Sequence, residues 1–319
     1  MNSNPLVSIC CITYNHAQYI RQCLDGILMQ KVDFEYEIIV HDDASTDGTS
    51  EIIGEYSNKF SDLIVPIFQS ENQYSKGVRG MYVKFVFPRA RGKYIAICEG
   101  DDYWIDENKL QMQVDFLENN PEYGMCYTKA KQYIQSNQKF NKKSVGDAFD
   151  GFEDLLKNGN RIPTLTTVYR KDLLDKYQKE IQPSTQCWLM GDYPMWLYFA
   201  HESKIKFFDK YTAVYRVLEN SASHSVDVEK MFRFDKSCME IQIFYSNKYN
   251  VNIELKDDSF IKFYVCVNML KNKYNSDIAK LVRLEYKKTN NKNYKMFVYY
   301  VCAQNACFWS FFIKYLCKM

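Results

Sequence analysis

Three acidic residues, Glu99, Asp101 and Asp102, follow directly after a short apolar stretch, Tyr94 to Cys98. This stretch has the length and composition of a buried strand. Carboxylates this close repel one another in a partly dry site unless a cation neutralises them, and their hard oxygen atoms suit Mg²⁺ or Mn²⁺. Because ligands of open α/β sheets bind at the carboxyl ends of strands, the position favours a metal-dependent site. The same residues also suit a solvated acidic turn that caps the next helix.

Acidic side chains stand at two further places where an apolar stretch meets a polar one. Asp42 and Asp43 follow a second predicted strand, Glu37 to Val40. Asp192 follows Gly191 at the start of an aromatic helix, where the helix N-terminus stabilises a carboxylate. Capping of that helix is the alternative interpretation, since Asp is a common N-cap residue.

The elements that must position these acids alternate between strand and helix in the first part of the chain. The pattern predicts strands at 6–12, 37–40, 64–69 and 94–98 and helices at 20–28, 50–60 and 78–89, the last interrupted by Pro88. Such alternation implies right-handed crossovers and a mainly parallel sheet flanked by helices, a Rossmann-like α/β fold.

The next part of the chain continues with mixed elements. We expect a helix at 107–119 with Asp106 as its N-cap, strands at 125–134 and 164–169, a short helix from Lys171, a helix from Gly191, and short strands at 205–208 and 213–216. The polar stretch 135–151 is expected to be a loop, as is 218–225, which carries His224.

From Asp227 onward the pattern predicts helices alone, so we expect a domain at 1–226 and a helical extension at 227–319. The aromatic and apolar segment 296–316 follows several lysines. Gln304, Asn305 and Ser310 interrupt it, which argues against a spanning helix and leaves an interfacial membrane helix and a helix packed on the first domain as alternatives.

Composition narrows the class of protein. A net charge of only +2 over 319 residues gives no support for a nucleic-acid partner. The 11 cysteines are an odd number without a CxxC pair, which favours free thiols in a reducing cytoplasm. The first residues lack the basic and apolar regions of a signal peptide. We therefore expect a cytoplasmic protein, with peripheral membrane contact only if the segment 296–316 lies in the interface.

Three stretches together resemble the inverting nucleotide-sugar glycosyltransferases of family 2, which have the GT-A fold. They are Val7 to Asn15, the DDASTDGT run from Asp42 to Thr49, and EGDD from Glu99 to Asp102. A fourth, Gly191-Asp192, lies where that family keeps its catalytic base. The resemblance covers about Leu6 to Ser225, and its strength lies in the order and spacing of the motifs.

The resemblance implies a role for each matching residue. Tyr14 would lie along the base of the donor nucleotide, and Asp43 would accept a hydrogen bond from uracil or ribose, with Asp42 supporting the turn. The full set of implied nucleotide-binding residues is Ile12, Tyr14, Asn15, Asp42, Asp43, Arg79 and Asp101, although a solvated role for Arg79 stays open.

The implied metal ligands are Glu99, Asp101, Asp102 and His224, for Mn²⁺ or Mg²⁺. Glu99 replaces the first Asp of the commoner Asp-x-Asp pattern, which leaves open which acid touches the ion. Asp192 would take the proton of an acceptor hydroxyl that attacks the anomeric carbon, while the nucleoside diphosphate, UDP by expectation, departs.

The implied setting is the synthesis of surface polysaccharide or lipopolysaccharide, with a saccharide or lipid-linked saccharide as acceptor. Two alternatives remain. A nucleotidyltransferase would share the sheet and the metal acids, but Thr13 to His16 contains no glycine-rich phosphate loop. A catalytically inactive glycan-binding or scaffold protein would keep the fold, yet here every acidic position is filled.

Overall fold

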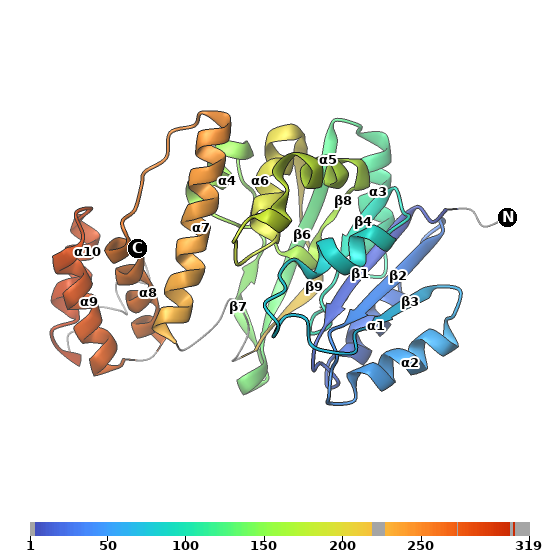
Figure 1. Cartoon of the computed structure of the whole chain (residues 1–319), viewed down its shortest axis with the longest axis horizontal. Helices are drawn as coiled ribbons and strands as arrows, with labels where there is room; N and C mark the ends of the chain where they lie inside the picture. Colours follow the sequence, from blue (N-terminus) through green and yellow to red (C-terminus); the bar gives the residue numbers. More distant parts are fainter. Residues whose placement is uncertain (1–3, 219–226, 273, 307–308, 310–319) are drawn as a thin grey trace. The chain divides into compact units, whose positions relative to one another are not determined.

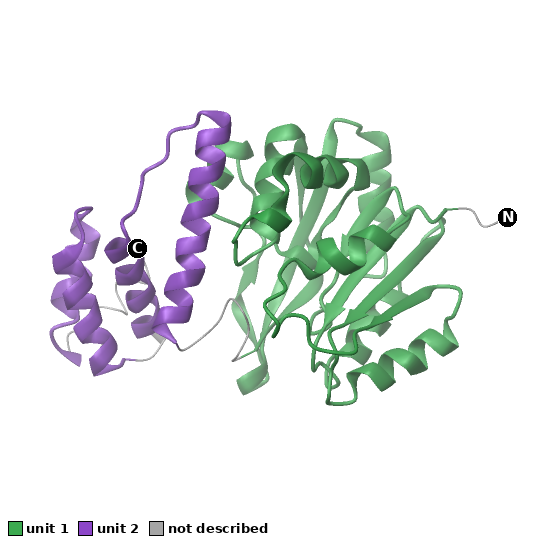
Figure 2. Ribbon diagram, viewed as in Figure 1, with its two compact units in different colours: residues 1–218 green, residues 219–319 purple. Residues whose placement is uncertain are grey.

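The computed structural model describes residues 4–218, 227–272, 274–306 and 309. The chain divides into two units, residues 1–218 and 219–319 (Figure 2), and each is described by itself.

Unit 1 is built around a mixed sheet, in which the described strands follow the order β3-β2-β1-β4-β8-β6-β9-β5 and β7 pairs with β6 (Figure 1). The strands β1 to β4 are parallel neighbours, and β8 then joins β4 in the antiparallel sense. The strand bounds are β1 Val7–Thr13, β2 Tyr36–Asp42, β3 Ile64–Phe68, β4 Tyr94–Ile97, β5 Tyr103–Trp104, β6 Tyr123–Ile134, β7 Lys139–Val145, β8 Val168–Arg170 and β9 Lys204–Val217. This is the expected mixed α/β architecture with a parallel half.

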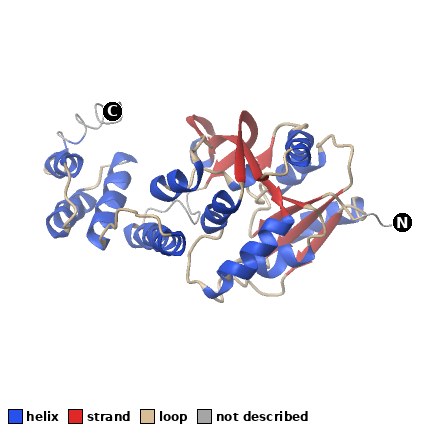
Figure 3. Cartoon of the chain, turned by 90° about the horizontal axis from the view of Figure 1, so that it is seen from above, coloured by secondary structure: helices blue, strands red, loops and turns tan. Residues whose placement is uncertain are grey.

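Helices lie on both sides of this sheet (Figure 3). They are α1 Ile20–Leu28, α2 Thr49–Lys59, α3 Lys109–Asn119, α4 Gly151–Asn158, α5 Lys171–Ile181 and α6 Asp192–Glu202. Short 3₁₀ turns are η2 Phe87–Arg89, η3 Gln135–Asn137, η4 Thr164–Thr166 and η5 Pro183–Thr185, and η1 Tyr82–Val86 is a π-helical turn.

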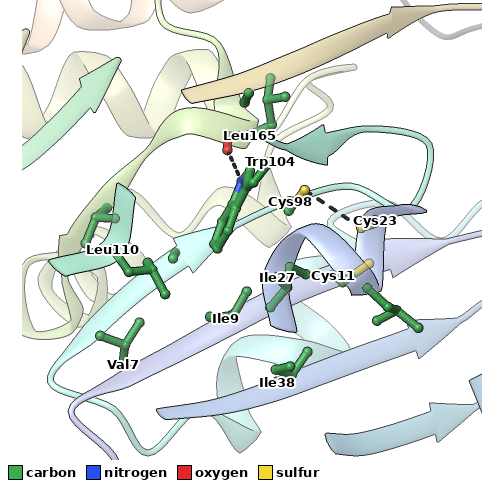
Figure 4. Close-up of a cluster of buried hydrophobic side chains, with 14 of the residues drawn as sticks. Val7, Ile9, Cys11, Cys23, Ile27, Ile38, Cys98, Trp104, Leu110 and Leu165 are labelled. Carbon is green, nitrogen blue, oxygen red and sulfur yellow. Dashed lines mark hydrogen bonds between the residues drawn. The ribbon is translucent and has the colours of Figure 1, made fainter. Parts of the chain in front are cut away.

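One face of the parallel strands packs against α1 and α3 in an apolar core (Figure 4). Apolar residues spaced three or four apart on α1, among them Ile20, Leu24 and Ile27, are fully buried, as the period of the helix requires. Trp104 fills the middle of this core, and its indole N–H donates to the carbonyl of Leu165 at 2.7 Å. The core thereby fixes the residues just before Trp104, which include the acidic cluster.

The expected elements are found with shifted ends, except in five places. The predicted strand 164–169 is the turn η4 followed by the short strand β8. The N-cap residue of α3 is Asn108 and not Asp106. The stretch 135–151 is not a loop, because it contains β7 and the start of α4. The predicted strands 205–208 and 213–216 are one strand, β9, and the predicted helix 78–89 is reduced to the turns η1 and η2. Five residues of β7 are exposed and mostly polar, so β7 has no apolar alternation to reveal it.

Unit 2 consists of the helices α7 Val228–Tyr249, α8 Asp258–Asn272, α9 Ser276–Lys288 and α10 Tyr294–Cys302 in its described residues. The predicted segment 296–316 begins within α10, and Met296, Tyr299 and Cys302 pack into the apolar core that α8, α9 and α10 share. Residues 307–308 and 310–316 of that segment lie outside the described part. In the described chain we find no helix with the length and apolar character that crossing a membrane would need.

Candidate active site

The carboxyl ends of β1, β2 and β4 meet at one edge of the sheet, because these strands are parallel neighbours. Gly100 leaves β4 there, and its N–H donates to the carbonyl of Ile12 at 3.0 Å. A Cβ at Gly100 would lie 2.6 Å from Oγ1 of Thr13 and 3.1 Å from Nδ1 of His16, so only glycine fits. Those two polar atoms are buried and have no hydrogen-bond partner in the described structure.

Asp42 and Asn15 organise the loop that follows β2. The Asp42 carboxylate accepts hydrogen bonds from Ser45 and from the Ser50 hydroxyl. Asn15, in a left-handed conformation with φ of 54°, donates its N–H to Ser45 Oγ at 2.8 Å and accepts from the Thr46 N–H at 2.9 Å. Asn tolerates this conformation better than most residues. Both predicted nucleotide-binding residues therefore shape the loop itself.

Asp43 holds a second loop against the same edge. Its carboxylate accepts from the backbone N–H groups of Gln73 at 2.8 Å and Tyr74 at 3.0 Å. Arg79 stays within that loop: its guanidinium donates to the carbonyl of Tyr74 and lies 4.1 Å from the centre of the Tyr74 ring. The structure therefore brings Asp43 to the edge, while the contacts of Arg79 are local, and a role of Arg79 toward phosphate stays a prediction.

Two more predicted nucleotide-binding residues belong to β1 and its end. Ile12 is partly buried within the strand, and Tyr14, the first residue after it, is 43% exposed. An exposed aromatic ring beside Asn15 has a free face for stacking on a planar ligand.

The acidic cluster is tied to β9 by Arg216, a residue that the sequence analysis missed. The Arg216 N–H donates to Asp102 Oδ1 at 2.7 Å, and its Nε donates to the carbonyl of Asp101 at 2.7 Å. Its remaining guanidinium nitrogens donate to Gln135 and Gln22. Nothing local in the sequence marks Arg216, since only the pairing of β9 brings it to the acids.

Burial and the charges of neighbouring acids make two members of this cluster, Glu99 and Asp102, hard to ionise. Burial and the charge of Asp101, with a further contribution from Asp192, raise the pKa of Glu99 to about 8. Burial, Asp101 and Glu99 together raise the pKa of Asp102 well above its ordinary value. Glu99 Oε2 is buried without a hydrogen-bond partner among the described residues. A cation would relieve this repulsion, so the donor set suits one chemically.

Asp192 is the first residue of α6, and Gly191 takes the N-cap position. The Asp192 Oδ2 atom accepts from Asn160 Nδ2 and from Thr164 Oγ1, both at 3.1 Å. Burial raises the pKa of Asp192 in spite of these hydrogen bonds. Because Asp192 also acts on the pKa of Glu99, two acids more than 90 positions apart in the chain share one electrostatic environment. Asn160 and Thr164 are further residues that the sequence did not reveal.

The described residues do not gather three His, Cys, Asp or Glu side chains as a metal ion would require. His224, the fourth predicted ligand, lies outside the described part of the chain. The assignment of Glu99, Asp101, Asp102 and His224 as metal ligands therefore remains a prediction.

Comparison with known proteins gives a family match. The model of the family described as "Glycosyl transferase family 2" matches residues 8–178. An uncharacterized protein of Mycobacterium tuberculosis is 40% identical over 166 residues, which are 52% of this chain and 47% of that protein. The Escherichia coli UDP-Glc:alpha-D-GlcNAc-diphosphoundecaprenol beta-1,3-glucosyltransferase WfgD is 28% identical over 200 residues, 63% of this chain and 72% of WfgD. The chain spans about half the length of the first of these relatives.

Solved structures share the fold. Residues 1–349 of Staphylococcus aureus TarS, in complex with UDP-GlcNAc, superpose with a TM-score of 0.55 at 17% identity, covering 88% of this chain and 85% of that one. The mannosyltransferase PcManGT from Pyrobaculum calidifontis, in complex with GDP-Man and Mn²⁺, superposes with a TM-score of 0.53 at 14% identity, covering 99% and 86%. Both are GT-A glycosyltransferases, so the GT-A expectation for the fold is confirmed.

Proposed function

Because the chain belongs to glycosyl transferase family 2, we propose that it transfers a sugar from a nucleoside-diphosphate sugar to an acceptor hydroxyl with inversion at the anomeric carbon. The observation that carries the proposal is the approach of Asp192 to the acidic cluster, close enough to raise the pKa of Glu99. One displacement needs an acid or cation site for the leaving group and a separate base for the nucleophile. Glu99, Asp101 and Asp102 serve the first need and Asp192 the second.

The proposed donor is a UDP-sugar, held at the edge formed by β1 and β2. Tyr14 would stack on the base, while Ile12, Asn15, Asp42 and Asp43 would shape the surrounding pocket. The TarS complex with UDP-GlcNAc and the name of WfgD, which specifies UDP-Glc, support uridine. GDP-Man in PcManGT makes GDP the alternative to test.

In the proposed reaction the acceptor hydroxyl oxygen attacks the anomeric carbon while Asp192 takes its proton. The bond from that carbon to the diphosphate oxygen breaks, and the nucleoside diphosphate leaves with the electron pair. The raised pKa of Asp192 suits this step, since a base works best when its pKa approaches the working pH. Asn160 and Thr164 orient the carboxylate by donating to Oδ2.

A divalent cation, Mn²⁺ or Mg²⁺, would be held by the acids Glu99, Asp101 and Asp102, with His224 as a further proposed ligand. Bound there, it would neutralise the charge that develops on the leaving diphosphate. Two observations support this assignment: the unpartnered Glu99 Oε2, and the mutual repulsion that raises the pKa of Glu99 and Asp102. PcManGT, which shares the fold, is an example with bound Mn²⁺.

The proposed setting is the assembly of cell-surface polysaccharide at the cytoplasmic side of a membrane. WfgD, by its name, acts on a lipid-linked saccharide, which supports a saccharide acceptor here. Peripheral contact through residues 296–316 is part of the proposal: Phe297 and Val301 are exposed on α10, and Lys287, Lys288, Lys292 and Lys295 precede them. Co-sedimentation with anionic vesicles, before and after deletion of 296–316, tests that contact.

The experiment that tests the proposed function is a donor screen with the purified chain. UDP-sugars and GDP-sugars are offered with Mn²⁺, and both the melting temperature and the slow hydrolysis of the donor are measured. We expect one nucleotide series to raise the melting temperature, since a ligand that binds only the folded state stabilises it. We expect hydrolysis of a sugar from that series. Pyrophosphate-dependent exchange would instead favour a nucleotidyltransferase, and neither hydrolysis nor exchange would favour a binding protein.

A further inference from the structure

A row of lysine and aromatic side chains lies on one face of the strands β6, β7 and β9, which run side by side in Figure 1. Register places Tyr133 beside Phe140 of β7 and Arg216 of β9, Lys131 beside Ser144, and Lys129 beside Tyr211. Paired residues of neighbouring strands point to the same side of a sheet. We call this surface the β6–β7–β9 face: Lys129, Lys131, Tyr133, Phe140, Lys142, Ser144, Tyr211 and Arg216.

The aromatic rings of this face are open to solvent. Phe140 is 55% exposed and Tyr211 43% exposed, although each is large and apolar. The Phe140 ring meets Tyr133 in a T-shaped arrangement at 5.1 Å between centres. A hollow of about 240 Å³ is lined by Lys131, Phe140, Lys142 and Tyr211, together with Asn141, Lys143 and Ser144. Exposed rings beside a hollow offer a stacking surface for the apolar side of a sugar.

Two of the four cations of this face, Lys131 and Lys142, lack a counter-charge among the described residues, whereas Lys129 contacts Asp209 and Arg216 contacts the acidic cluster. Lys129 pairs with Asp209 at 2.5 Å, but Lys131, Lys142 and Lys143 form no ion pair with any described residue. Lys131 instead lies 6.0 Å from the centre of the Phe140 ring. Unpaired cations close together repel one another, so an anion bound among them gains from each. Charge complementarity therefore favours a ligand that is negatively charged.

The face is continuous with the candidate active site. The Arg216 guanidinium lies 5.6 Å from the centre of the Tyr133 ring, and its Nε donates to the Asp101 carbonyl. Tyr133 in turn contacts Phe140. A chain that lies on this face would therefore have one end beside the acidic cluster.

We propose that the β6–β7–β9 face binds the acceptor, and that the acceptor is a glycan chain carrying phosphate groups along its length. The proposal rests on the proposed function, because it names the substrate of the same site. Lys129 and Lys131 lie two residues apart on β6, about 7 Å along the strand, and Lys142 lies on the neighbouring strand. Cations spread in this way match charges that repeat along a chain, whereas a lipid diphosphate concentrates its charge at one point.

The test compares the full-length parent with the double variant Lys131→Gln/Lys142→Gln and with Phe140→Ala. The probes are phosphorylated dextran oligosaccharides and the same oligosaccharides after phosphatase treatment. We expect the parent to bind the phosphorylated probe at least tenfold more tightly, and the lysine variant to lose about tenfold in affinity for it alone. Phe140→Ala should weaken both probes. The matched control is Lys176→Gln/Lys179→Gln on the exposed side of α5, which should change neither.

Donor hydrolysis without acceptor is measured for every variant, and we expect parent values throughout because none of the substitutions touches the acids. If the parent did not hydrolyse the donor, the proposed function would be contradicted. The acceptor proposal would not be, because binding of the phosphorylated probe is measured separately. Equal binding of the two probes by the parent, or an unchanged lysine variant, would overturn the acceptor proposal. Vesicles of phosphatidylglycerol form the last arm: lysine-dependent binding to vesicles without binding to the oligosaccharide would assign the face to a membrane instead.

Discussion

Two glutamates at opposite ends of the parallel strands, Glu37 buried and Glu99 partly buried, differ in their partners. Glu37, near the amino end of β2, accepts hydrogen bonds from Ser8 Oγ at 2.7 Å, from the Arg91 N–H at 2.9 Å and from the Arg91 guanidinium at 2.6 and 2.9 Å. Glu99, after the carboxyl end of β4, has one buried oxygen without any partner among the described residues. Asp101 and Asp192 lie near enough to raise its pKa.

The difference lies in the hydrogen-bond partners of the two acids, and it is the basis on which we propose a functional role for Glu99 and a structural one for Glu37. Both ends of the sheet use a glycine for close approach: a Cβ at Gly92 would lie 2.5 Å from the Ser8 nitrogen, and one at Gly100 would meet Thr13. At the amino end the space is filled by hydrogen-bonded protein atoms. At the carboxyl end Thr13 Oγ1 and Glu99 Oε2 have no hydrogen-bond partner among the described residues. Because buried polar groups otherwise find partners, this supports the proposal of a ligand site there.

The largest expected effect concerns Asp192, which contributes to the raised pKa of Glu99. We predict that Asp192→Asn slows sugar transfer at least about a hundredfold, because an amide cannot take the acceptor's proton. Asn keeps an oxygen that can accept from Asn160 and Thr164, so donor binding and melting temperature should stay near those of the parent. Transfer is measured with saturating donor and acceptor.

The matched control is Asp172→Asn, an exposed aspartate in the first turn of α5. It should transfer at the parent rate. Near-normal transfer by folded Asp192→Asn would remove Asp192 from the role of base, and a collapse of its melting temperature would assign Asp192 to holding the start of α6.

The next largest effect concerns Glu37, near the amino end of β2. Glu37→Gln should lower the free energy of unfolding by about 1–3 kcal/mol, because it leaves buried donors of Ser8 and Arg91 without a full acceptor. Because the side chain of Arg91 is half-exposed, we expect a smaller loss of unfolding free energy than for a fully buried ion pair. Urea unfolding measures it. Transfer per folded molecule should not change.

Glu118→Gln provides the contrast, since Glu118 pairs with Lys93 at the surface. This substitution should lower the free energy of unfolding by no more than about 1 kcal/mol. Equal costs for Glu37→Gln and Glu118→Gln would show that the buried network of Glu37 adds nothing to stability.

The sequence predicted the elements that the apolar pattern encodes. Leu24 and Ile27 of α1, and the apolar residues of β1 and β2, have the spacing of buried faces, and those elements are found. The strand β7 was missed because its side chains are exposed and polar, and only pairing with β6 makes it a strand. The helix predicted at 78–89 is not formed for a different reason. Pro88 and the turns η1 and η2 interrupt the regular hydrogen bonding of an α-helix.

At the site, the acids were predictable because a strand end displays them within a few residues. The residues that join the acids to the rest of the protein were not predictable. Arg216, Asn160 and Thr164 reach Asp101, Asp102 and Asp192 through contacts across 28 to 115 positions of sequence. Such contacts depend on strand order and register, which residue spacing does not encode.

A third prediction tests the unpartnered state of Glu99 through pH. Its folded-state pKa of about 8 lies above the ordinary value, so between about pH 4.5 and pH 8 the folded chain binds more protons than the unfolded chain. Stability of the parent should therefore fall as pH rises through this window. Glu99→Gln should make that fall smaller, leaving the share of Asp102, and at pH 9 its free energy of unfolding should exceed that of the parent by at least about 1.4 kcal/mol, the equivalent of one pKa unit.

The measurement is urea unfolding at pH 4.5, 7 and 9 in EDTA, so that no added cation contributes. Glu118→Gln is again the control and should follow the parent. A variant whose stability depends on pH as steeply as the parent's would show that Glu99 is not destabilised by its surroundings, and the contrast with Glu37 would disappear.

The smallest effect comes from Lys109, a buried and unpartnered charge that lies away from the acids of the site. Lys109 is fully buried, its Nζ has no hydrogen-bond partner among the described residues, and it lies 4.1 Å from the centre of the Trp104 ring. Burial lowers its pKa to about 7. Between about pH 7 and pH 10.4 the unfolded chain therefore binds more protons, so this residue makes the parent more stable as pH rises. Lys109→Met should raise stability by about 1 kcal/mol at pH 6.5, because an apolar side chain of similar length removes the buried charge, and the gain should fade toward pH 10.5.

Lys109 separates two interpretations of an unpartnered buried group. If lack of a partner alone marked a functional residue, Lys109→Met would slow transfer as a change at Glu99 should. We expect parent transfer rates instead, because Lys109 faces Trp104 in the apolar core, and Asp106, the acid that acts on its pKa, is not one of the acids of the acidic cluster. Lys179→Met on the exposed side of α5 is the control for the substitution itself. A stable Lys109→Met protein with slow transfer would extend the site beneath Trp104, and a loss of stability at pH 6.5 would mean that the contact with the Trp104 ring outweighs the cost of burial.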